Sequence, residues 1–251
     1  MRDDLDLSVP VPDDVRRVVS LVPSLTEAVA ASAPGLLVGA TDWCTHPAEL
    51  DVVRVRGTKN PDLDTIRALA PDLVLANEEE NRAVDLAALR AAGIAVWVTR
   101  VRGLDEAFTA LERMLAIGCR LPVPPWLDRC RAAWAALPPA PPPRRAIIPV
   151  WRRPWMVAGR DTFAGDVLAR FGVVNVFASH PERWPGIPLE ELRAAAPDLV
   201  VLPDEPYAFS ADDGPEAFPG VPAALVSGRH LTWYGPSLAE APALLAARLA
   251  P

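Results

Sequence analysis

The sequence is poor in the residues on which several large classes of protein depend. It has one lysine, three histidines and two tyrosines in 251 residues, and its formal net charge is −7. Because a nucleic-acid-binding surface needs clustered positive charge, this balance argues against a nucleic-acid partner. The three cysteines, Cys44, Cys119 and Cys130, are an odd number without the repeated spacing of a zinc site. We therefore expect free thiols in a reducing compartment.

Long apolar runs and nucleotide-binding motifs are also missing. No stretch reaches about 18 consecutive apolar residues, so no membrane span is expected. Residues 1–15 are acidic and lack the apolar centre of a secretory signal. They predict a cytoplasmic protein, with an exported or periplasmic location as the alternative if a leader is missing. The glycine-rich dinucleotide fingerprint, the Walker lysine motif and the nucleophile elbow are absent, so the sequence predicts a protein that is not an enzyme.

The sequence does contain an internal repeat. Residues 63–80 and 189–206 share a short amphipathic segment, the tetrapeptide Pro-Asp-Leu-Val and a polar tail. The proline ends a helix, and the apolar run behind it is typical of a buried strand. The two copies lie about half the chain apart, which predicts two α/β lobes of related design.

The repeat and a proline-rich segment together predict the domain organisation. We expect two three-layer α/β lobes with central, mainly parallel sheets, bridged by a single connecting helix. Residues 138–143 contain five prolines and predict a stiff spacer at the lobe boundary. The predicted parts are an N-terminal arm at 1–15, an N-terminal lobe at 16–121, a connecting helix and spacer at 122–143, and a C-terminal lobe at 144–251.

Aromatic and polar side chains collect in the loops that follow the predicted strands. Ligands bind at the carboxyl ends of strands in open α/β sheets, so these loops predict a binding cleft for a large, partly flat molecule. The alternative is that each aromatic ring packs its loop onto its own lobe, and that Lys59 and Glu78 are solvated. The predicted ligand-binding residues are Ser24, Asp42, Trp43, His46, Lys59, Asn60, Glu78, Trp151, Arg152, Trp155, Trp184, Tyr207, Trp233 and Tyr234.

Two of the positions at the end of the second predicted strand also suit a metal. Cys44 and His46 form a Cys-x-His pair, and a soft or borderline metal accepts both ligand types. A third ligand would have to be a remote histidine, and the sequence has two more, His180 and His230. The alternatives for His46 are contact with a metal already held by an organic ligand, or a hydrogen bond within its own loop. Cys44 and His46 therefore stand as candidate metal ligands with these alternatives open.

Several segments resemble a known family. They are residues 17–27 (RVVSLVPSLTE), 57–61 (GTKNP), 63–75, 92–99 (AGIAVWVT) and 188–202. In these the chain resembles the substrate-binding proteins of vitamin B12 and iron–siderophore ABC transporters, also called helical backbone metal receptors or class III periplasmic binding proteins.

The resemblance implies a ligand, a partner and a mode of action. The ligand would be a metal chelate in the cleft between the lobes, with cobalamin or another corrinoid first and a ferric siderophore or haem next. The partner would be an ABC permease, the chain would be a monomer, and no intrinsic cofactor is expected. The alternative is a cytoplasmic enzyme or cofactor carrier that has repurposed the same fold.

Overall fold

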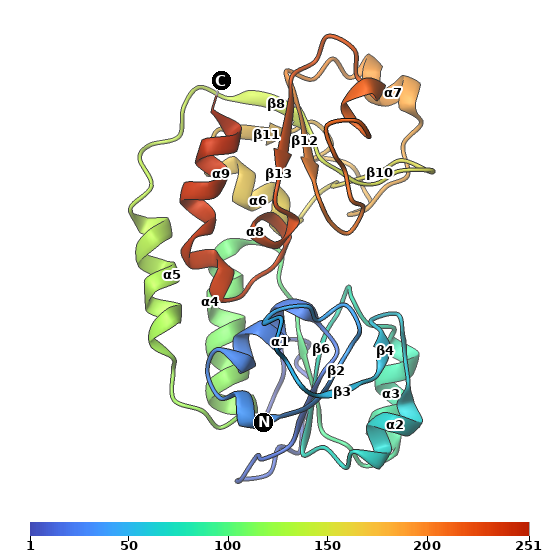
Figure 1. Cartoon of the computed structure of the whole chain (residues 1–251), viewed down its shortest axis with the longest axis vertical. Coiled ribbons are helices and arrows are strands. Elements are labelled where there is room, and N and C mark those ends of the chain that lie inside the picture. Colours follow the sequence, from blue (N-terminus) through green and yellow to red (C-terminus); the bar gives the residue numbers. More distant parts are fainter. Residues whose placement is uncertain (251) are drawn as a thin grey trace. The chain divides into compact units, whose positions relative to one another are not determined.

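The computed structural model describes residues 1–250, which form two compact units (Figure 1). The first unit comprises residues 1–101, 105–129 and 234–236, and the second comprises residues 102–104, 130–233 and the chain from 237 onward. Each unit contains a parallel sheet flanked by helices, which confirms the predicted α/β class with two lobes. The chain passes from the first unit to the second within α5 (Pro125–Ala135).

The first unit is built on a parallel five-stranded sheet in the order β3-β2-β1-β6-β7. Its strands are β1 (Val18–Ser20), β2 (Leu37–Ala40), β3 (Val53–Arg54), β6 (Leu73–Asn77) and β7 (Val96–Thr99). The chain fills one side of β1 first and then the other. A reversal of this kind opens a crevice at the carboxyl ends of the central strands, where α/β proteins bind ligands.

Helices cover both faces of this sheet, and a small hairpin lies beside it (Figure 1). On one face are α1 (Pro23–Ala30), α4 (Leu104–Arg113) and a π-helical turn (Met114–Gly118), and on the other are α2 (Leu63–Ala68) and α3 (Ala83–Ala91). A short 3-10 turn (Pro34–Leu36) leads into β2, and β4 (Arg56–Gly57) pairs with β5 (Asn60–Pro61). Buried aliphatic side chains of the central strands form the core beneath α2 and α3.

The second unit repeats the design with a parallel four-stranded sheet in the order β11-β8-β12-β13. Its strands are β8 (Arg144–Ile147), β11 (Val173–Asn175), β12 (Leu199–Pro203) and β13 (Ala223–Val226). Beyond Ile148 the chain continues as β9 (Pro149–Trp151), which pairs with β10 (Met156–Val157) in an antiparallel hairpin. Here too the first strand, β8, lies between later ones, so its carboxyl end is a second candidate crevice.

The helices of this unit lie mainly on one face of its sheet (Figure 1). They are α6 (Phe163–Ala169), α8 (Gly228–Thr232) and α9 (Ala241–Leu249), with α7 (Leu189–Ala194) on the other face and 3-10 turns at Pro215–Ala217 and Pro236–Ala239. No helix among residues 1–250 combines the length and the apolar character needed to cross a membrane.

The sequence repeat corresponds to equivalent structural units, α2–β6 and α7–β12. In each copy the aspartate after the proline accepts a hydrogen bond from the backbone at the start of the adjacent strand: Asp72 from Arg17, and Asp198 from Arg145. The same two arginines donate back to carbonyl groups at the end of the preceding helix. Each repeat therefore fastens a helix end to the first strand of its own sheet.

The predicted N-terminal arm is tied to the first unit by long-range contacts. The backbone amide of Asp4 donates to the carbonyl of Val98 on the edge strand β7, at 3.1 Å. The buried Asp3 carboxylate lies 3.6 Å from Arg90, and Asp4 lies 3.1 Å from Arg113. The arm thus covers a sheet edge that would otherwise be open for pairing. Its anchors are distant in sequence, so local composition does not reveal them.

Candidate functional site

The carboxyl edge of the first sheet is organised by amide side chains. The Asn77 side chain donates to the carbonyl of Thr99 at 3.0 Å and accepts from the amide of Glu79 at 2.8 Å. Asn81 accepts from the Asn77 amide at 2.9 Å and donates to the carbonyl of Thr58 at 3.0 Å. Both side chains are buried. They join the loops after β4, β6 and β7 into one rigid rim.

Trp43 is the exposed aromatic side chain on this rim. It follows β2, and 66% of its surface is exposed. Its indole lies against the β4–β5 hairpin: a Cβ atom at Gly57 would be 3.3 Å from Trp43 Nε1 and 2.4 Å from Asn60 Oδ1. A larger residue at position 57 would displace the Asn60 amide and crowd the indole, so Gly57 favours this close arrangement of Trp43 and Asn60.

Cys44, one of the two candidate metal ligands, faces the core of the first unit. Its side chain is fully buried, its sulfur accepts a hydrogen bond from the Thr26 hydroxyl at 3.0 Å, and it lies 3.1 Å from the Thr41 hydroxyl. Burial raises the pKa of this thiol, which disfavours the thiolate that a metal requires. Residues 1–250 contain no group of three His, Cys, Asp or Glu side chains placed to hold a metal ion. The thiol faces the core because the turn from Thr41 to Cys44 directs it inward.

The other polar candidates of the first unit remain near the surface. Asp42 is exposed, and its backbone amide donates to the carbonyl of Arg56 at 2.9 Å. His46 is partly exposed, with Nδ1 3.1 Å from the Thr45 hydroxyl, which is one of the alternatives that the sequence left open. The Lys59 amine donates to the carbonyl of Glu79, while Glu78 is exposed. Lys59 therefore joins two loops of the rim.

Three predicted ligand-binding residues are buried. Ser24, Trp233 and Tyr234 have only 3%, 8% and 7% of their surface exposed. Ser24 lies in the first turn of α1, whose N-cap residue Val22 makes no side-chain cap. The Tyr234 hydroxyl lies beside Thr99 and Ser24, and burial raises its pKa far above the ordinary range. The three side chains therefore pack in the interior, and Tyr234 belongs to the first unit although its segment follows α8 of the second.

The second unit presents an aromatic pair at the carboxyl ends of adjacent strands. Trp151 ends β9 and is 43% exposed, and Tyr207 lies in the loop after β12. Their ring centroids are 5.6 Å apart and the rings meet edge to face, at 79°. Tyr207 also contacts Phe209, with centroids 4.6 Å apart. The favourable edge-to-face geometry holds the two rings in place.

Arg152 fastens the loops that carry these rings. Its side chain is 12% exposed and forms ion pairs with both Asp213 and Glu216. The guanidinium also lies over the ring of Trp155, 5.2 Å from its centroid. The Tyr207 hydroxyl donates to Asp213 at 2.6 Å, so the network extends to the aromatic pair. Arg152 therefore holds the loops of the site together, and its charge is balanced by Asp213 and Glu216.

Trp155 and Trp184 contribute differently from Trp151. Trp155 is partly buried, stacks on Phe209 at 6.0 Å and packs edge-on against Phe218 at 5.5 Å, beside the core of the second unit. Trp184 is also partly buried, in the loop after β11. Trp155 thus supports the loop that carries Tyr207 rather than standing as an exposed anchor.

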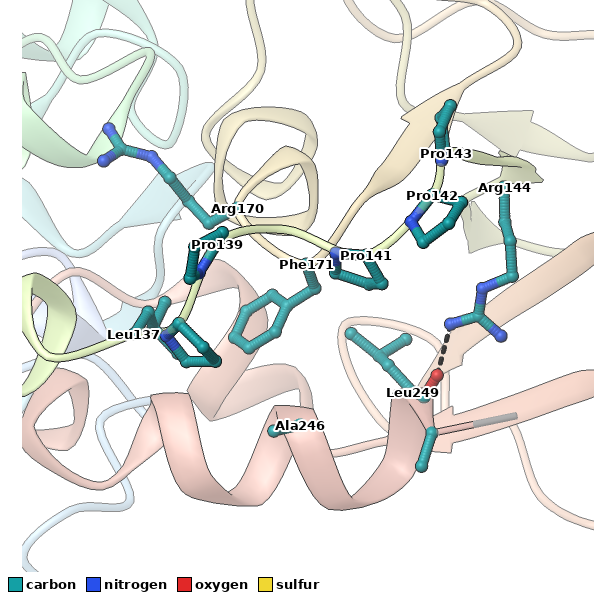
Figure 2. Close-up of a pocket in the computed structure, with 12 residues that line it drawn as sticks. Leu137, Pro139, Pro141, Pro142, Pro143, Arg144, Arg170, Phe171, Ala246 and Leu249 are labelled. Atoms are coloured by element: carbon teal, nitrogen blue, oxygen red, sulfur yellow. Dashed lines mark hydrogen bonds between the residues drawn. The ribbon is translucent and has the colours of Figure 1, made fainter.

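A separate groove of about 440 Å³ lies at the opposite edge of the second sheet (Figure 2). It is lined by the proline-rich spacer, by Phe171 and by α9 residues including Ala246 and Leu249, near Arg144 at the start of β8. Arg144 donates to the carbonyl of Leu249. Its lining includes none of the predicted ligand-binding residues, so the groove is distinct from the site at Trp151 and Tyr207.

Sequence reasoning missed the residues that hold these sites in shape. The role of Asn77 and Asn81 could have been predicted, because asparagine at a strand end favours a turn closed by its side chain. The role of Asp213 and Glu216 could not, since they lie 61 and 64 residues from Arg152 in the sequence. Counter-charges at such separations become visible only when the chain is folded.

The comparisons with known proteins agree with the resemblance predicted from the sequence. No protein-family model matches the chain. The vitamin B12-binding protein of Vibrio cholerae is 24% identical over 207 residues, covering 78% of this chain and 74% of the relative. A periplasmic heme-binding protein from Pseudomonas aeruginosa matches with a TM-score of 0.73 and 26% identity, over 93% of this chain and 92% of that one. The Helicobacter pylori protein CeuE with Ni(II) bound matches with a TM-score of 0.83 and 13% identity, over 100% and 88%.

These comparisons correct the predicted location and support the predicted function over its alternative. The cytoplasmic location is wrong, because solved structures similar to this chain are of periplasmic proteins, which points to export. The Vibrio cholerae and Pseudomonas aeruginosa proteins are binding proteins by name, which favours a binding protein over an enzyme built on the same fold.

Proposed function

We propose that this chain is the substrate-binding protein of an ABC transporter and that it binds a metal chelate. A cobalamin or another corrinoid is the first candidate, and haem or a ferric siderophore follows. The observation that carries the proposal is the exposed Trp151 ring, braced by Tyr207 and the Arg152 network at a sheet edge. Rigid exposed rings suit stacking on a flat macrocycle, because little conformational entropy is lost on binding.

The names of the relatives support the class of ligand. Vitamin B12-binding and heme-binding proteins both take large, flat, metal-containing macrocycles. The chelate is cargo in this proposal, so the chain acts by binding and release and needs no catalytic group. The partner that follows is an ABC permease, with the 27.0 kDa chain acting as a monomer.

The first unit supplies a second candidate contact surface. Trp43 is exposed and positioned by Gly57 and Asn60, with Asp42 and the partly exposed His46 in the same loop. An imidazole nitrogen is a good axial ligand for the metal of a chelate. That the ligand contacts residues of both lobes stays a prediction from the sequence.

Calorimetric titration with cyanocobalamin, haemin and a ferric siderophore tests the proposal. Trp151→Ala and Trp43→Ala should each weaken binding about thirtyfold, because truncating an aromatic anchor costs about 2 kcal/mol. Their melting temperatures should fall by no more than a few degrees, since Trp43 is 66% and Trp151 43% exposed and neither ring is part of a core. Leu244→Ala on α9, which truncates a side chain of similar exposure (45%), is the matched control and should leave affinity unchanged. Dissociation constants above about 100 μM for all three chelates would exclude the proposed function.

A further inference from the structure

We propose that the aromatic face of the second unit selects a neutral or cationic chelate and disfavours a polyanionic one. The aromatic face is defined as Trp151 and Tyr207 with the loops 152–155 and 204–217 that carry them. This inference rests on the proposed function, and it concerns the charge of the ligand rather than its shape.

The first observation is the charge of these loops. They contain two arginines, Arg152 and Arg153, and five carboxylates, so their formal net charge is −3. The carboxylates are Asp204, Glu205, Asp212, Asp213 and Glu216. A surface with this excess of one sign repels ligands of the same sign over about one Debye length.

The second observation is that Arg152, the cation beside the rings, already has two acidic partners. Its 12%-exposed side chain is paired with Asp213 and with Glu216, and these are 39% and 50% exposed. The backbone amide of Gly214 and then Arg152 itself hold the pKa of Glu216 below its usual range, so this carboxylate is ionised at neutral pH. A ligand carboxylate could reach Arg152 only by displacing two charged partners, which would stay behind near the ligand.

The third observation is that the neighbouring loops do not reverse this charge. Loop 176–188 after β11 carries one glutamate and one arginine, Glu182 and Arg183, together with His180. Arg229 on α8 lies 3.2 Å from Glu240, which is also hydrogen-bonded to His230. Arg153, at the β9–β10 turn, is exposed, and the formal net charge of −3 includes it. Arg193 on α7 donates to the carbonyl of Ala217 at 2.8 Å and adds one positive charge, so a formal net charge of −2 remains at the aromatic face.

The chelates considered under the proposed function differ in their net charge. Cyanocobalamin is neutral overall, because its phosphate balances the charge of the cobalt centre. Haem carries two propionates, and many ferric siderophores are anions. On the aromatic face the anionic ligands lose affinity through charge repulsion, and added salt screens that loss.

The test compares cyanocobalamin with its dicarboxylic acid, in which two peripheral amides are hydrolysed and the ring is otherwise unchanged. At about 0.02 M salt the diacid should bind about tenfold more weakly than cyanocobalamin, and at about 0.5 M salt this ratio should shrink severalfold. Glu216→Gln removes one charge and should reduce the low-salt ratio about threefold. Glu190→Gln, an exposed position on α7, is the matched control and should leave the ratio unchanged.

The outcomes separate this inference from the function on which it rests. If cyanocobalamin binds and the diacid binds equally well or more tightly, the charge selection is wrong and the proposed function stands. The charge selection is also wrong if the diacid binds more weakly but the affinity ratio changes neither with salt nor in Glu216→Gln. The cause of the weaker binding is then steric. If no chelate binds, the proposed function fails and the inference fails with it.

Discussion

Adjacent residues in this chain have opposite surroundings and therefore opposite roles. Trp43 is 66% exposed, while the next residue, Cys44, is fully buried between Thr26 and Thr41. A hydrogen bond from the Cys44 amide to the carbonyl of Thr41, at 3.1 Å, closes the turn that separates them. The ring is available for a ligand, and the thiol belongs to the core.

The buried thiols give a prediction at this scale. Cys44, Cys119 and Cys130 form no disulfide and are buried. Burial raises the pKa of Cys44 and brings that of Cys119 to about 12. Because the thiolate is the reactive form, an aromatic disulfide reagent at pH 8 should label none of the three in the native protein. All three should react after unfolding in guanidinium. Rapid labelling of native Cys44 would place it at the surface and reopen its role as a metal ligand.

Among the secondary-structure elements, the repeated helix–strand unit has a strained backbone turn directly before its helix-ending proline. In each copy an alanine with a positive φ separates the helix from the proline: Ala70 at 42° and Ala196 at 47°. An L-residue pays about 1–2 kcal/mol in this conformation. The hydrogen bonds of Asp72 and Asp198 hold the strained turn in place.

Ala70→Gly and Ala196→Gly should therefore stabilise the protein. Glycine adopts positive φ without the steric cost, and its greater freedom when unfolded offsets only part of the gain. The expected net effect is about 0.5 kcal/mol, or roughly 1–2 °C in melting temperature. Ala68→Gly and Ala194→Gly, at the last residue of each adjacent helix, are matched controls and should lower stability by about 0.5 kcal/mol. A drop in melting temperature for both turn variants would show that these turns are not strained.

The whole molecule consists of two units, each with its own parallel sheet and its own hydrophobic core. Each sheet carries exposed aromatic residues at its carboxyl edge, Trp43 in the first and Trp151 in the second. Units with separate cores need not unfold in one step. Thermal unfolding can therefore report on each unit separately.

This organisation predicts how a bound chelate changes thermal unfolding. A ligand at about 100 times its dissociation constant stabilises the native state by about 2.7 kcal/mol. If the ligand contacts both units, differential scanning calorimetry with cyanocobalamin should move every transition upward by several degrees. Trp43→Ala and Trp151→Ala should each reduce this shift. An increase confined to one of two resolved transitions would restrict the ligand to a single unit.

Local pattern in the sequence was enough to predict the α/β class, the two lobes and the repeat. A helix period, a helix-ending proline and an apolar strand occupy neighbouring positions, so short-range physical chemistry specifies them. Strand-end positions likewise pointed to Trp43 and Trp151 as exposed rings. The sequence did not reveal that Cys44 and Tyr234 face the interior, that Asp4 bonds to β7, or that Arg152 is paired. These features depend on partner residues that can lie more than one hundred positions away in the sequence. Burial and ion pairing are set only when folding brings such residues together.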